Sequence, residues 1–243
     1  MISEQYYKGI THCLETILKT QKEKMEQAAK VVANVIKQDG IIYMFGCGHS
    51  HLIALDNFYR AGGLVNVSAV LDTDLMLHNG AAKSSAMERM EGIMPHVLKR
   101  YCITPKDMLF VFSTSGINGA PVDAAKYAKE QGIPCITVSS MAYKEETSRH
   151  SSGKHLYDFA DVSIDNCVPH GDAVMHIDGI ETPMGSVSTA ASSFITQSVL
   201  MEGASLAAEA GAKPPVYLSG NIEGGAEFNK SLIEAYLPRV KHL

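Results

Sequence analysis

The sequence predicts an α/β fold, a three-layer sandwich in which a parallel sheet lies between two layers of helices. Short, almost wholly apolar segments recur along the chain, and amphipathic helical patterns separate them. A strand that is apolar at every position is buried on both faces, and strands that alternate with helices form parallel sheets through right-handed crossovers. Five strands are predicted, at residues 41–45, 64–71, 108–112, 133–138 and 162–164.

The helices are predicted from apolar residues that recur at steps of three and four. Residues 3–37 read as one or two amphipathic helices that end at Asp39-Gly40. Residues 121–131 begin with proline and are followed by Gly132, the usual order of helix start and stop signals. Further helical stretches are expected at 84–100, 187–210 and 229–236.

The organisation of the chain indicates a single domain of residues 1–243 with three additions. These are the N-terminal helices (3–37), an insertion between the second and third strands (72–107) and a C-terminal extension (211–243). The insertion is too long for a simple crossover, and long insertions are often functional. The Ala/Ser-rich helix at 187–210 carries few charges, which predicts burial, in part between subunits.

Composition excludes several classes of protein. Of the residues, 46% are hydrophobic and 19% charged, and 21 Lys+Arg against 26 Asp+Glu give a net charge of −5. No basic stripe is present, so nucleic acid is not the expected partner. The first ten residues lack the pattern of a signal peptide, and the apolar runs are too short to span a membrane. Five scattered cysteines predict free thiols in a cytoplasmic protein.

Two loops that follow predicted strands carry the chemistry. Gly46-Cys47-Gly48-His49-Ser50 offers glycines that let backbone N–H groups approach a ligand, ahead of the positive end of a helix. Ser113-Thr114-Ser115-Gly116-Ile117-Asn118 offers three hydroxyls, an amide and free N–H groups. Ligands bind at the carboxyl ends of parallel strands, where these loops converge. Together they predict a site for a phosphate monoester.

A dinucleotide site is the competing interpretation. Asp72, at the end of the second predicted strand, stands about where a ribose-binding acid would be. However, His51 occupies the place of the third glycine of the dinucleotide motif, and the second loop would have no role in holding a pyrophosphate. The phosphate monoester is therefore favoured.

The two loops, with the strands before them, resemble the SIS (sugar isomerase) domain. The similar segments are IIYMFGCGHSHLIALDNF and LFVFSTSGINGAPVDAAKYAKEQGIPCITVSS, and the helix opening at Gly185-Ser186-Val187-Ser188-Thr189 is similar to the last helix of many members. The resemblance implies a flavodoxin-like strand order 2-1-3-4-5, a homodimer or homotetramer, and a phosphorylated sugar as ligand. The whole chain most resembles a bacterial subgroup related to phosphoheptose isomerases and to N-acetylmuramic acid 6-phosphate etherases.

The resemblance also implies site residues. The phosphate would be held by Ser50, Ser113 and Ser115, with Thr114 contributing its backbone N–H. Asn118 stands where many members have Thr or Ser. Gly46 and Gly48 complete the set of expected ligand-binding residues. Where phosphoheptose isomerases carry a His and a Glu for metal binding and catalysis, this chain has Asp56 and Arg60.

We expect no cofactor and no metal. The histidines form no ligand pair at helical spacing, such as H-x-x-x-H. The departure at positions 56 and 60 also removes the basis for the phosphoheptose reaction and its metal.

Chemistry on a sugar phosphate needs a group that moves a proton, and a carboxylate is the usual base. Glu88 and Glu91, predicted to share one helical face, lie in the segment where the etherases resemble this chain and carry an essential glutamate; a solvated face with Arg89 as counter-charge is the alternative. Glu202 is a third candidate. For ring opening we expect His170, ahead of His49 and His78.

Three functions follow from these residues. The first is aldose–ketose isomerisation of a sugar phosphate. The second is β-elimination by a lyase or etherase, and the third is a sugar-phosphate sensor without catalysis. DNA regulation is disfavoured because the first 40 residues show no helix-turn-helix pattern.

Overall fold

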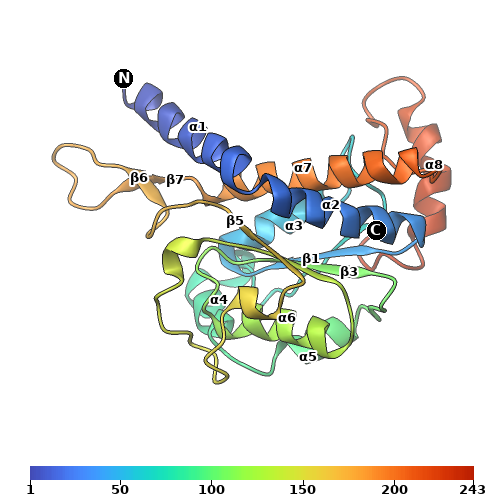
Figure 1. The fold of residues 1–243 in the computed structure, drawn as a ribbon. Helices are drawn as coiled ribbons and strands as arrows, with labels where there is room; N and C mark the ends of the chain where they lie inside the picture. The colour runs from blue at the N-terminus through green and yellow to red at the C-terminus, as the bar shows by residue number, and fades with distance from the viewer.

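The computed structural model describes residues 1–243, and a five-stranded parallel sheet forms its centre (Figure 1). The strand order is β2-β1-β3-β4-β5. The predicted fold class and the implied order are therefore confirmed. The strands are β1 (Ile42–Gly46), β2 (Val67–Ala69), β3 (Met108–Phe112), β4 (Cys135–Ser139) and β5 (Val162–Asp165).

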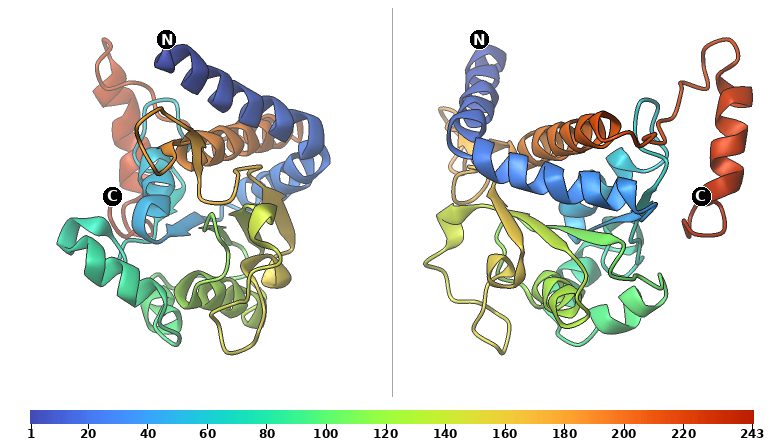
Figure 2. Two further views of the ribbon diagram at one scale, coloured as in Figure 1. Left: turned by 90° about the vertical axis from the view of Figure 1, so that its left-hand side faces the viewer. Right: turned by 45° about the vertical axis from the view of Figure 1, so that its right-hand side comes forward.

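Helices cover both faces of the sheet, as Figures 1 and 2 show. One face carries α1 (Ile2–Thr20), α2 (Lys22–Lys37), α3 (His51–Asn57) and α7 (Ser188–Glu209). The other face carries α4 (Ala81–Glu88), α5 (Met94–Lys99) and α6 (Gly119–Glu130). Four short 3-10 turns lie between them: η1 (Gly48–Ser50), η2 (Leu77–Asn79), η3 (Met141–Tyr143) and η4 (Leu156–Phe159).

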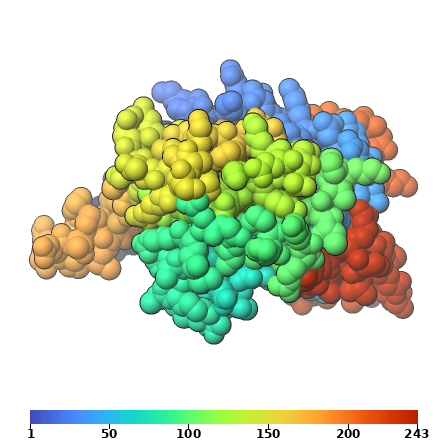
Figure 3. All heavy atoms as spheres, turned by 90° about the horizontal axis from the view of Figure 1, so that it is seen from below, coloured from blue at the N-terminus to red at the C-terminus, as the bar shows by residue number.

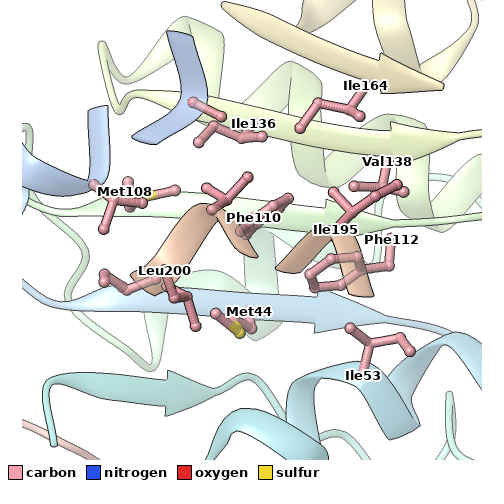
Figure 4. Packing of buried hydrophobic residues seen from close by; sticks show 14 of the residues in the cluster. Met44, Ile53, Met108, Phe110, Phe112, Ile136, Val138, Ile164, Ile195 and Leu200 are labelled. Carbon is pink, nitrogen blue, oxygen red and sulfur yellow. The ribbon is translucent and has the colours of Figure 1, made fainter. Parts of the chain in front are cut away.

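The side chains of the central strands point alternately to the two sides of the sheet, so an apolar run makes both faces of the sheet apolar. In β3, Met108, Phe110 and Phe112 point into the core beneath α2 and α7, where Phe110 packs near Ile195 of α7 (Figure 4). Leu109 of the same strand joins the core on the α5 and α6 side. Successive strand residues face opposite ways, so a continuous apolar run needs a layer on each side.

The pattern at 3–37 forms two helices, one of the two outcomes expected. Two other predicted elements differ in detail: the pattern at 84–100 forms α4 and α5 with a break between them, and the second strand is shorter than predicted. Gly92 lies in that break with φ +81°, and its amide donates to the carboxylate of Asp123. The second strand covers only Val67–Ala69, and at its amino end the chain turns to the C-terminal extension, where Leu64 bridges to Val216.

The segment after β5, which is rich in Gly, Pro and His, contains a hairpin of β6 (Ala173–Met175) and β7 (Met184–Ser186). The hairpin projects from the body of the molecule at the left of Figures 1 and 3. It contacts α1, where the hydroxyl of Tyr6 donates to the carbonyl of Ser186 at 2.6 Å. Its short strands carry no apolar alternation, so periodicity gave no signal for them.

Helix α7 packs closely on α2. A Cβ added at Gly203 would lie 2.5 Å from a Val32 methyl, so glycine permits this approach. The side of α7 that carries Met201 and Glu202 is exposed. Glu202 therefore needs no partner to offset burial, and its hydration removes the argument for a functional carboxylate there.

The C-terminal extension forms α8 (Gly225–Tyr236) and a short tail at the amino end of the sheet (Figure 1). Val240 of the tail is 1% exposed and joins the core on the α5 side. No helix of the structure combines the length and the apolar character needed to cross a membrane.

Candidate functional site

The two predicted phosphate loops leave the sheet side by side. Strands β1 and β3 are neighbours, and Gly46 pairs with Phe112 in their register. The next residues, Cys47 and Ser113, therefore start their loops at the same level of the sheet, at the carboxyl ends of the strands.

The first loop needs both of its glycines. A Cβ at Gly46 would meet the carbonyl oxygen of Ser50 at 2.5 Å, so a side chain there would push the loop open. Gly48 has φ +54°, a left-handed conformation, and its amide donates to the carbonyl of Leu75 at 2.9 Å. Ser50 is half-buried at the end of this turn. The helix that follows, α3, has only 7 residues.

The second loop is held by its carbonyl groups and leaves amides free. The carbonyls of Thr114, Gly116 and Ile117 each accept a backbone bond of 2.8 Å from outside the loop. The N–H groups of Thr114 and Ser115 have no acceptor within the chain. Ser113 is buried, and its Oγ accepts from the Gly116 amide at 3.3 Å. Fixed backbone donors of this kind suit an anion.

Both loops line a cleft of about 360 Å³, which we call the carboxyl-edge cleft. Helix α4 closes it on one side, and η3 and the start of α7 close it on the other. No lysine or arginine lines it, so hydroxyls, amides and backbone N–H groups supply its donors. Its lining residues are Cys47, Gly48, His49, Ser50, Leu77, Ala81, Ser84, Ser85, Glu88, Ser113, Thr114, Ser115, Asn118, Tyr143, Asp172 and Ser188.

Glu88 reaches this cleft and is held there by Asn118. The Asn118 Nδ2 donates to Glu88 Oε1 at 2.8 Å, and Arg149 Nη1 donates to Asn118 Oδ1 at 2.6 Å. Asn118 occupies the N-cap position of α6, yet its side chain makes no capping bond. The amide therefore links Arg149 to Glu88. Arg89, expected as a counter-charge, donates instead to the carbonyl and hydroxyl of Ser85.

Glu91 lies outside the cleft, and the expectation that it shares a helical face with Glu88 is wrong. Helix α4 ends at Glu88, and Glu91 follows in the turn before α5. Its carboxylate accepts from the amide and hydroxyl of Ser151 at 2.6 and 2.5 Å. The hydroxyl bond above all lowers the pKa of Glu91. Glu91 is an exposed, ionised group that binds the loop after β4.

The histidines are placed differently from one another. His49 lines the cleft and is exposed. His170 is exposed outside the cleft lining, with its Nε2 3.2 Å from Glu146 Oε1 and its ring centroid 4.5 Å from that of Tyr143, the two planes tilted by 31°. His78 packs edge-on against His51 at 5.0 Å. His51 is 1% exposed, its Nε2 has no partner, and burial lowers its pKa.

Among the residues that carried no prediction from the sequence, Tyr143 and Asp172 line the cleft, and Arg149 bonds to Asn118 beside it. Tyr143 follows the carboxyl end of β4, where the rule applied to β1 and β3 would have directed attention to it. Asp172 accepts from the Ser188 amide at 2.8 Å and hydroxyl at 2.6 Å, and so fixes the start of α7 beside the cleft. Arg149 comes from a long loop without any motif.

Other candidates lie away from the cleft. Asp72 Oδ1 accepts from the Asp74 amide at 3.0 Å and closes its own turn. Asp56 of α3 pairs with Arg60, which lies beyond the end of that helix. The structure holds no cluster of three or more His, Cys, Asp or Glu that could bind a metal.

The cysteines are free thiols, and Cys47 is the one that lines the cleft. Burial, with a further contribution from Glu88, holds the pKa of its thiol well above the usual value. The thiol of Cys47 therefore stays protonated. Because only the thiolate is a good nucleophile, Cys47 serves as a neutral residue of the cleft wall.

Comparisons with known proteins identify the family. A model described as the SIS domain matches residues 5–140. A UPF0309 protein of Geobacillus thermodenitrificans is 43% identical over 98% of this chain and 96% of its own. Another from Caldanaerobacter subterraneus is 45% identical, with coverage of 99% and 98%.

Solved structures agree in fold. A phosphoheptose isomerase from Neisseria gonorrhoeae gives a TM-score of 0.55 at 17% identity, over 86% of this chain and 100% of that one. The sugar isomerase domain of an RpiR transcription factor from Sphaerobacter thermophilus gives 0.53 at 18% identity, over 85% and 92%. With more than half of its length matched by the family model, this chain belongs to the SIS domain family.

Proposed function

We propose that the chain binds a phosphorylated sugar in the carboxyl-edge cleft and catalyses its aldose–ketose isomerisation. The observation that carries the proposal is the pair of adjoining loops, which present three serine hydroxyls and two free amides to one cleft. The names of structural neighbours, a phosphoheptose isomerase and a sugar isomerase domain, agree with such a ligand.

The phosphate would be held by Ser50, Ser113 and Ser115, with the amides of Thr114 and Ser115. A phosphate dianion accepts short, charge-assisted hydrogen bonds from such donors, and each contributes more than a neutral pair does. The absence of a lysine or arginine from the lining makes the site dependent on shape and on loop conformation.

Glu88 is proposed as the base. Isomerisation of an aldose removes the proton from C2 while O1 gains a proton, which gives the enediol. A proton then returns to C1 as O2 loses its proton and the carbonyl forms at C2. A single carboxylate beside both carbons can take the first proton and deliver it to the second. Asn118 would hold Glu88 in position through its 2.8 Å bond, and Arg149 would hold Asn118.

Ring opening needs a group that exchanges a proton with the ring oxygen. His49 lines the cleft, whereas His170 is outside the lining and contacts Tyr143. We therefore assign ring opening to His49 first and keep His170 as the residue that orients Tyr143. Glu91 has no place in this scheme, because its carboxylate is bound to Ser151.

The test is solvent exchange. The purified chain is incubated in D₂O with hexose, pentose, heptose and N-acetylamino-sugar phosphates, and deuterium at C2 of the aldose or C1 of the ketose is followed by NMR. Incorporation with formation of the isomer is the expected result. Loss of the C3 substituent would indicate β-elimination instead of isomerisation. Binding of a sugar phosphate without exchange would indicate a sensor instead of an enzyme, and no binding would overturn the proposal.

Assembly and compartment are part of the same proposal. A homodimer or homotetramer is expected from the family resemblance, and light scattering after size exclusion measures it. A cytoplasmic location fits the five free thiols.

A further inference from the structure

A second cavity lies at the opposite end of the sheet. It has a volume of about 430 Å³, within the range of about 300–1,000 Å³ usual for small-molecule sites. The residues that precede β1 and β3 form its floor, and the C-terminal tail forms a wall. Arg100, Lys106, Arg239 and Lys241 line it, and we call it the basic pocket.

The carboxylates of the basic pocket are already engaged. Asp107 is 6% exposed and accepts from the Ile41 amide at 2.7 Å and from the amide and hydroxyl of Thr104, both at 2.8 Å. Asp39 pairs with Arg239 at 2.7 Å and accepts from Tyr236 at 3.1 Å. Asp107 keeps its negative charge, so the four cations and two carboxylates of the lining give the pocket a net charge of +2.

Three cations of the pocket form no ion pair within 4.0 Å: Arg100, Lys106 and Lys241. Lys241 Nζ donates to the carbonyl of Arg100 at 3.2 Å and lies 5.2 Å from the centroid of the Tyr101 ring. This positive charge stands on a chain whose net charge is −5, and an anion is its electrostatic complement.

The wall of the pocket is fixed in place. Val240 is 1% exposed between Arg239 and Lys241, so the two cations project from an anchored backbone. The ring of His242 beyond them meets the Tyr101 hydroxyl at 2.9 Å. In Figure 3 the C-terminal atoms lie against the segment before β3.

We propose that the basic pocket binds a small molecule that carries a phosphate group. Arg100, Lys106 and Lys241 supply the positive charge, and the arginine offers a planar pair of donors that matches phosphate oxygens. Nucleotides and sugar phosphates both present this chemistry. The pocket is separate from the carboxyl-edge cleft, with which it shares no lining residue.

The experiment measures pyrophosphate binding by calorimetry in the full chain with Ser113→Ala and Ser115→Ala, which weakens the cleft. We expect pyrophosphate to bind this chain still. Adding Arg100→Ala, Lys106→Ala and Lys241→Ala should weaken binding by more than about tenfold, the loss of charge-assisted bonds. Adding Lys8→Ala, Lys19→Ala and Lys24→Ala, which removes the same charge from exposed helix positions, should leave it within about twofold.

Two outcomes would overturn the proposal: no binding by the chain with the altered cleft, or equal binding after the pocket and control substitutions. Equal binding of a sugar phosphate by the wild-type and Ser113→Ala/Ser115→Ala chains would instead count against the proposed function and leave the basic pocket standing. All three cations are exposed, and circular dichroism checks that the variants fold; Lys106→Ala alone provides a milder change. Repeating the titration with ATP and with fructose 6-phosphate distinguishes the two sources of phosphate.

Discussion

The two ends of the parallel sheet present opposite kinds of polar surface. At the carboxyl ends of the strands, the cleft holds hydroxyls, free amides and Glu88, with no lysine or arginine. At the amino ends, the basic pocket gathers four cations. A ligand in the cleft must match fixed directions, whereas one in the pocket must chiefly match charge. The comparison suggests selective recognition at one end and a broader preference for anions at the other.

The largest expected effect comes from replacing Glu88, the proposed catalytic base in the cleft. Glu88→Gln keeps the size of the side chain and removes the proton acceptor, so turnover should fall by about 10²- to 10⁴-fold. Binding of the sugar phosphate should change little. The matched control is Glu91→Gln, three residues away and outside the cleft. Equal losses in the two variants, measured by deuterium exchange, would remove the assignment of Glu88.

The second expected effect distinguishes the phosphate loops of the cleft from the cations of the basic pocket in the binding of a sugar phosphate. Ser115→Ala should weaken sugar-phosphate binding by about 10- to 100-fold, since it removes a hydrogen bond to a charged group. Lys106→Ala should leave that affinity unchanged, because Lys106 lines only the pocket at the far end. Calorimetry with the best sugar phosphate measures both, and a reversed order of effects would contradict the contrast between the ends.

The third effect is a difference in salt dependence. Raising NaCl from about 0.05 to about 0.5 M should weaken pyrophosphate binding at the basic pocket by roughly tenfold and sugar-phosphate binding at the cleft by roughly twofold. Exposed cations are screened more than directed bonds from buried donors. Affinities measured across this range check it, and parallel slopes would mean that both sites depend equally on charge.

The smallest effect is a pKa shift at the pocket wall. Burial, then Lys241 and Arg100, lower the pKa of His242 from its usual 6.5. Removing the two cations should raise that pKa, because the imidazolium then meets less positive charge. Pyrophosphate should raise it as well, since an anion favours the charged ring. NMR titration of the ring protons follows both, with His12 on the exposed face of α1 as the control.

The fold could be predicted well because its signals are local and repeated. The run Met108–Phe112 is apolar at each position, and the strand has those bounds in the structure. The carboxyl-end rule brought Gly46 and Ser113 to one place, and the register of β1 and β3 does the same. Continuous apolar strands and the loops after them are readable from sequence, whereas the order of the strands came from the family resemblance.

The details of the candidate site were harder to predict. Glu88 and Glu91 have the spacing of a shared helical face, but Gly92 turns the chain between α4 and α5, and its amide meets Asp123 from a distant helix. Arg149 reaches Asn118 from a loop of no regular pattern. Such contacts join residues about 30 positions apart, so they depend on tertiary structure, which local periodicity does not encode.

The position of Asn118 has an evolutionary consequence. Its amide accepts from Arg149 on one atom and donates to Glu88 on another. A serine or threonine has a shorter side chain with a single hydroxyl oxygen. That oxygen would have to accept from Arg149 and donate to Glu88, and it cannot span the same gap. A change from asparagine to a hydroxyl residue would therefore leave the arginine without its acceptor. Across relatives, residues at positions 118 and 149 are expected to vary together, as a pair inherited or lost as a unit.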